Sequence, residues 1–69
     1  MSVVKIIELV GSSSTSSDDA VQNALADAKL TLRNIKAVDV VSTGLRGEEL
    51  SEWRAHIRVA FLIDRGVNE

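Results

Sequence analysis

The sequence predicts a small α+β domain with the element order strand, helix, strand, strand, and three observations lead to this prediction. Val3–Val10 is a short segment rich in Val and Ile, which is typical of a strand. Apolar residues then recur at steps of three and four, which indicates an amphipathic helix. From Trp53 to Ile63 apolar side chains alternate with mostly polar ones, which indicates a strand with one buried face.

The first strand, Val3–Val10, is apolar on both faces, and Gly11 is predicted to end it. Its two faces consist of Val3, Ile7 and Leu9 on one side and Val4, Ile6 and Val10 on the other. A strand that is apolar on both faces is usually covered on both. The helix of so short a chain can cover only one face of a sheet. We therefore expect a second subunit to cover the other face.

The helix is predicted to run from Ser17 to Arg33, with Asn34 near its end. Ser16 suits the position before the helix because a Ser hydroxyl accepts a hydrogen bond from an orphan backbone N–H. The predicted apolar stripe consists of Val21, Ala24, Leu25, Ala28, Leu32 and Ile35. The serine-rich segment Ser12–Ser17 is interpreted as a connector, because no base and orienting acid accompany it to activate a nucleophile.

Ala37–Ser42 is predicted to be the second strand and Thr43–Gly47 the turn that follows it, because two glycines favour a turn. The third strand presents one apolar face, which we expect to pack on the helix: Trp53, Ala55, Ile57, Val59, Phe61 and Ile63. A helical crossover suits parallel strands with one strand between them. The predicted sheet is therefore antiparallel in the order 1-3-2, followed by a polar tail at Asp64–Glu69.

The composition limits the possible functions of this 69-residue, single-domain chain. A chain of this size buries only about 60% of its unfolded surface, and small scaffolds usually need a disulfide, a metal or a partner. Cysteine is absent and there is one His, so a disulfide is excluded and a structural zinc site is not expected. The net charge of −2, the scattered cations and the lack of a long apolar run predict a cytoplasmic protein without nucleic-acid or membrane partners. With 45% hydrophobic residues, self-association is the expected additional source of stability.

The chain as a whole resembles the dodecin family. The similar segments, in order, are VVKIIELVGSS at 3–13, DAVQNALA at 19–26, TLRNI at 31–35 and RVAF at 58–61. The resemblance covers residues 3 to 64, almost the full chain. It implies a β-α-β-β subunit that assembles into a hollow homododecamer. It also implies a binding or storage function, with a flavin (riboflavin or FMN) as the usual ligand, rather than catalysis.

Two positions depart from the pattern that the resemblance implies. Ala37 stands where the family has a Trp that stacks on the flavin, and Arg54 stands where it has a Gln that hydrogen-bonds the flavin. Ala has no aromatic face, and Arg only donates hydrogen bonds, whereas Gln both donates and accepts. The chain is therefore expected to be a variant in which ordinary flavin binding is compromised. The alternative is a flavin-free shell with a structural, calcium-binding or anion-binding role.

Asp39, His56 and Arg58 are predicted to share the sheet face opposite the helix with Ala37 and Arg54. The two arginines either bind an anion such as phosphate or form salt bridges to Asp39 or Glu52 of a neighbouring subunit. His56 is either a switch whose charge changes near neutral pH or a hydrogen-bonded interface residue.

Other groups leave a ligand or metal interpretation open beside a structural one. Asp18 and Asp19 either support the start of the helix or contribute to a Ca²⁺ site, which needs several oxygen ligands. The acidic group Glu48, Glu49 and Glu52 is either solvated or part of a metal site shared between subunits. Trp53 is either core or a ligand platform. No catalytic constellation is present, so we expect no enzyme.

Overall fold

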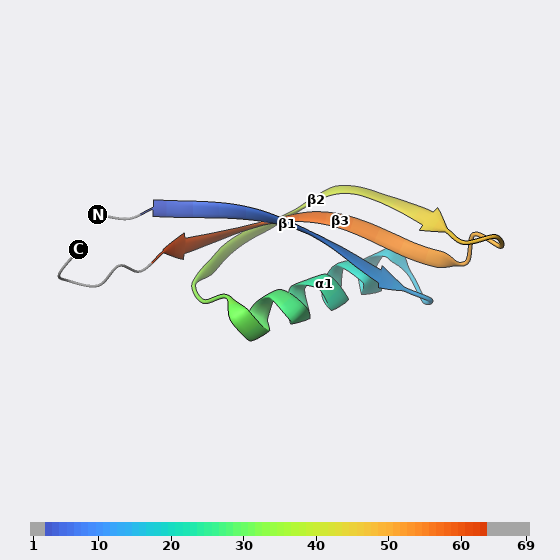
Figure 1. The fold of residues 1–69 in the computed structure, drawn as a ribbon, viewed down its shortest axis with the longest axis horizontal. Coiled ribbons are helices and arrows are strands. Elements are labelled where there is room, and N and C mark those ends of the chain that lie inside the picture. Colours follow the sequence, from blue (N-terminus) through green and yellow to red (C-terminus); the bar gives the residue numbers. More distant parts are fainter. Residues whose placement is uncertain (1–2, 64–69) are drawn as a thin grey trace.

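The computed structural model describes residues 3–63, which form one helix and one three-stranded sheet (Figure 1). The elements are β1 (Val3–Ser13), α1 (Ser17–Thr31), β2 (Ile35–Arg46) and β3 (Glu52–Ile63). Both strand pairs are antiparallel and the order is β1-β3-β2, so the predicted topology is confirmed. The predicted polar tail lies outside the described residues.

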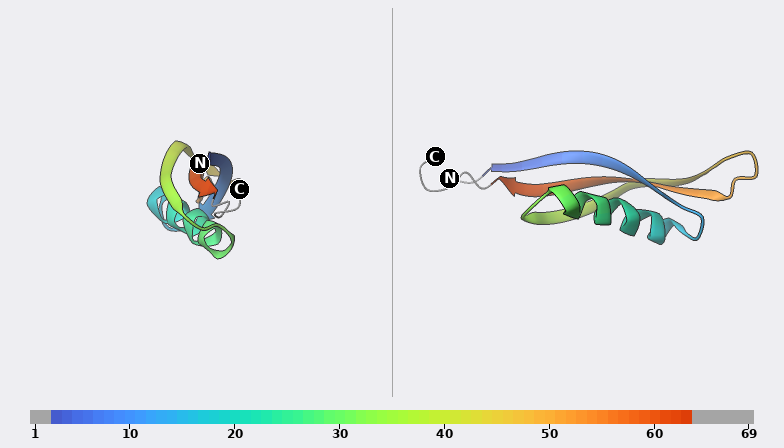
Figure 2. Two further views of the ribbon diagram at one scale, coloured as in Figure 1. Left: turned by 90° about the vertical axis from the view of Figure 1, so that its left-hand side faces the viewer. Right: turned by 60° about the horizontal axis from the view of Figure 1, so that its bottom comes forward.

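The helix covers one face of the sheet and leaves the other uncovered (Figure 2). α1 packs mainly against β1 and β3. The molecule is long and narrow, with principal extents of 53 × 19 × 15 Å. The hairpin of β2 and β3 extends past the end of the helix, as the right-hand view of Figure 2 shows. We call the uncovered side of the sheet the open face.

The core between helix and sheet is small, and the helix contributes alanines to it. The buried apolar residues are Ala20, Ala24, Ala28, Ala55, Ile57 and Val59. The predicted stripe was right for Ala24 and Ala28, but it omitted Ala20 and was centred too far toward Leu25, which is only half-buried. Small side chains at every fourth position let the helix axis approach the sheet closely.

Gly11 does not end β1, which continues to Ser13. It lies where the first strand passes under the helix, and it is buried. A Cβ atom at this position would overlap the backbone oxygen of Ala20 and come within 2.8 Å of Ala24 Cβ. The glycine is therefore needed for the close approach of helix and strand rather than for a turn.

The helix starts as predicted and ends earlier than predicted. Ser16 is the N-cap, and its hydroxyl accepts a 3.0 Å hydrogen bond from the backbone N–H of Asp19. The helix ends at Thr31 instead of Arg33, because Leu32 already has extended backbone angles. Asn34 has φ 59°, a left-handed conformation that Asn tolerates better than most residues. This turn directs the chain into β2.

β2 is twice as long as predicted, and the predicted turn at Thr43–Gly47 is wrong for all but its last residue. The chain turns at residues 47–50, where Gly47 has φ 96° and the Leu50 N–H donates to the Gly47 oxygen at 3.0 Å. Pairing with the central strand keeps Gly44 extended opposite Arg54. The alternation predicted for β3 is confirmed, since Ala55, Ile57 and Val59 are fully buried.

Candidate functional site

The open face carries the residues that the sequence singled out. The central strand β3 contributes Arg54, His56 and Arg58, which alternate with the buried residues of the same strand. β2 contributes Ala37, opposite Ala60, and Asp39, opposite Arg58. The pairing register therefore places all five predicted positions on one face.

Glu8 on β1 is the main polar partner on this face. Its carboxylate lies 2.6 Å from His56 Nε2 and 3.9 Å from Arg58 Nε. Both partners are its neighbours across the strand pair, since Glu8 is opposite Arg58 in the register. Sequence reasoning missed Glu8 because it lies within an apolar segment. Glu8 lies two residues after Ile6 and four after Val4, so its side chain is on the same face of the strand as theirs, and this spacing could have identified it as a residue of that face.

Arg54 forms its ion pair inside its own chain. Its Nε atom lies 2.6 Å from Glu52 Oε2, two residues earlier on the same strand and therefore on the same face. The prediction named Glu52 of a neighbouring subunit as a partner, whereas the contact in the structure is to Glu52 of the same chain. Asp39 forms no ion pair with Arg58 within the described part of the chain, although the two are opposite in register.

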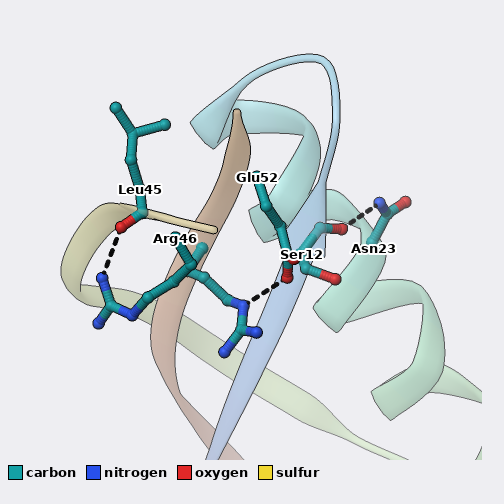
Figure 3. A network of polar contacts seen from close by, with 6 residues as sticks. Ser12, Asn23, Leu45, Arg46 and Glu52 are labelled. Atoms are coloured by element: carbon teal, nitrogen blue, oxygen red, sulfur yellow. Dashed lines mark hydrogen bonds and ion pairs between the residues drawn. The ribbon is translucent and has the colours of Figure 1, made fainter. Parts of the chain in front are cut away.

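A hollow of about 220 Å³ opens on the hairpin end of this face. Its lining residues are Val10, Ser42, Gly44, Arg46, Arg54 and His56. The Arg46 Nη1 atom donates a 2.9 Å hydrogen bond to the backbone oxygen of Leu45 (Figure 3). Sequence reasoning missed Arg46 because it assigned this residue to the turn.

The two positions at which the resemblance implies flavin contacts, Ala37 and Arg54, do not meet within one chain. Arg54 and the partner of Ala37, Ala60, are six residues apart on β3. At a strand rise of about 3.3 Å per residue the separation is about 20 Å. A pocket that contained both positions would need at least two copies of the chain.

The other end of the open face is apolar. Residues of all three strands form this apolar end: Val4, Ile6, Ala37, Ala60 and Leu62. Val4 and Ile6 are 56% and 55% exposed. The sequence predicted that the helix would leave one side of the first strand uncovered, and the structure shows that it is the side of Val4 and Ile6.

The metal interpretations receive no support from one chain. Asp19 is engaged at the helix start, where its Oδ2 accepts a 2.6 Å hydrogen bond from Ser13 Oγ and its backbone is capped by Ser16. Within residues 3–63, no group of three or more His, Cys, Asp or Glu side chains is placed to hold a metal ion. Trp53 packs against the core cluster, as the structural interpretation required. In the same residues no helix is long and apolar enough to span a membrane.

Solved structures with the same fold span nearly the whole chain. A single-substitution variant of the Thermus thermophilus dodecin is 34% identical, with a TM-score of 0.84 over 94% of this chain and 100% of that one. The dodecin of Streptomyces coelicolor is 25% identical, with a TM-score of 0.86 over 94% and 96%. A calcium dodecin from Mycobacterium tuberculosis, described as a calcium-chelating antigen, is 22% identical and has a TM-score of 0.81 over 94% and 96%. At that identity the likeness shows the fold alone.

No curated protein matches the sequence. The family model for dodecin matches residues 3–64, which include every strand and the helix. With the 34% identity to the Thermus protein, this match establishes the family. The chain belongs to the dodecin family.

Proposed function

We propose that this protein is a homo-oligomeric, non-enzymatic binding or storage protein of the dodecin type, with twelve copies forming a hollow shell. The observation that carries the proposal is the uncovered apolar end of the open face in a family member. Exposed apolar residues gathered on one side of a sheet favour association. The small core of one chain supplies little stability by itself.

The separation of the two family ligand positions also supports a binding site shared between copies. Ala37 and Arg54 lie about 20 Å apart in one chain, by the strand rise. They can contribute to one pocket only if copies bring their open faces together. The apolar end, which includes Ala37, is the part of this face that such contact would bury.

The proposed ligand is not an ordinarily bound flavin. Ala37 cannot stack on an isoalloxazine ring, and the Arg54 guanidinium offers no acceptor. Calcium, which the Mycobacterium tuberculosis relative chelates, would require carboxylates from several copies, because one chain brings no three together within residues 3–63. The alternative proposal is a flavin-free shell with a structural, calcium-binding or anion-binding role, in which any calcium would be held between copies.

Light scattering of the purified protein is expected to give a mass of about twelve times 7.5 kDa. Ile6→Glu should reduce that mass, because it places a charge in the apolar end. Ala26→Glu is the matched control, since Ala26 is an exposed helix residue, and it should leave the mass unchanged. A wild-type mass near 7.5 kDa would refute the assembly.

Flavin titration tests the ligand part of the proposal. The wild-type protein is expected to quench FMN and riboflavin fluorescence weakly or not at all. The double variant Ala37→Trp/Arg54→Gln should bind about 5- to 150-fold more tightly, because one aromatic stacking contact contributes about 1–3 kcal/mol. Ala26→Trp adds a Trp on the helix and serves as the control. Wild-type quenching as strong as that of the double variant would contradict the proposal.

A further inference from the structure

The hollow at the hairpin end of the open face combines space with hydrogen-bond donors. It measures about 220 Å³ and lies over the central strand, lined by residues of all three strands. Arg46 and Ser42 come from β2, and Arg54 and His56 come from β3. Gly44 has no side chain, so the strand backbone forms that part of the wall and leaves the space open.

The two arginines retain donors that face no acid. Within residues 3–63, Arg46 forms no ion pair, and its recorded hydrogen bond goes to a neutral backbone oxygen at 2.9 Å. Arg54 uses Nε for Glu52, so its two terminal nitrogens have no partner among the described residues. Glu52, which is opposite Arg46 in the strand register, bonds to Arg54 and forms no ion pair with Arg46 in the described residues.

The donor set suits a tetrahedral oxyanion. A guanidinium presents a planar fork of N–H groups that matches two oxygens of a phosphate at once, and two forks from adjacent strands can take different oxygens. Ser42 adds a hydroxyl donor. His56 lines the same hollow, but its Nε2 atom is engaged by the Glu8 carboxylate at 2.6 Å, so the donors offered to the anion come from the arginines and Ser42.

We propose that this hollow binds the phosphate group of a small phosphorylated molecule or free inorganic phosphate. The inference deepens the proposed binding function and rests on it, because it names the ligand class for the same open face. It assigns Arg54 a role at the position where the resemblance implies a flavin-bonding Gln. It also assigns Arg46, on the neighbouring strand, as the charge that attracts the anion.

Calorimetric titration of the wild-type assembly with inorganic phosphate tests the proposal, and a parallel titration with glycerol 3-phosphate separates free phosphate from a phosphate monoester. Saturable binding is expected, and it should weaken as NaCl is added because salt screens exposed charges. Arg46→Gln should lower the affinity at least about tenfold, since it removes a charged hydrogen-bond donor. Arg46 is paired with no acid in the described residues, so its removal leaves no carboxylate unpaired.

Arg33→Gln is the matched control, because it removes the same charge beyond the end of the helix and away from the hollow. It should leave phosphate affinity unchanged. No saturable heat with either probe, or equal losses in the Arg46 and Arg33 variants, would overturn the phosphate site. The light-scattering mass distinguishes the two failures: a twelve-subunit mass without phosphate binding keeps the shell and removes this site. Arg54→Gln is the second variant, should Arg46→Gln disturb assembly, and it should also weaken binding.

Discussion

Gly11→Ala is expected to destabilise the protein by about 3 kcal/mol, at the upper end for an overpacked core. The added methyl group would overlap the backbone oxygen of Ala20 and approach Ala24 Cβ to 2.8 Å. Neither atom belongs to a flexible side-chain end, so the whole helix must shift away from the first strand. That shift would loosen the contacts of Ala24 and Ala28 with the sheet. Urea unfolding at one fixed protein concentration measures the loss, because the stability of an oligomer depends on concentration.

Gly44→Ala is the control for this prediction. A Cβ atom there would lie 3.0 Å from Arg46 Nη1, which is the mobile end of a long exposed side chain and can move aside. We expect a change within about 0.5 kcal/mol, as for most surface substitutions. Equal unfolding midpoints for Gly11→Ala and the wild type would show that helix and strand do not need this close approach.

Ile57→Ala is the second substitution with a large expected effect, a loss of about 2–5 kcal/mol. Ile57 is fully buried at the centre of β3, between the helix and both outer strands. Its truncation removes apolar contacts and leaves a cavity that so small a core has few residues to fill. The fall in the urea midpoint checks this prediction.

Leu30→Ala removes the same number of carbon atoms from an exposed position and serves as the control. Leu30 is 81% exposed on the helix, and Ala is a good helix former, so the change in stability should be small. If the two truncations lowered the midpoint equally, the assigned core would be wrong. A larger effect of the Leu30 variant would instead indicate that the helix surface is buried between copies.

The strand-helix-strand-strand order and the buried face of the central strand could be predicted from the sequence, because both are local periodicities. Steps of three and four mark one side of a helix, and steps of two mark one side of a strand. Ala55, Ile57 and Val59 were identified in this way. The capping role of Ser16 could also be predicted, because it depends only on residues within a single turn of the helix.

The candidate site on the open face was predicted only in part, because its contacts join residues that are distant in the sequence. The parity of β3 placed Arg54, His56 and Arg58 on one face, but it could not name their partners on other strands. Glu8 meets His56 only through the β1–β3 register, and the two residues are 48 positions apart in the chain.

The sequence by itself determined the element types, their order and the buried face of β3, since each depends on neighbours within a few residues. The tertiary structure alone decided that Gly11 allows the close approach of the helix, that β2 continues past Gly44, and that Arg46 joins Arg54 around one hollow. Those features depend on pairing and contact between segments distant in sequence. The register that brings them together depends on where the hairpin turns, and that turn lies later in the chain than the sequence predicted.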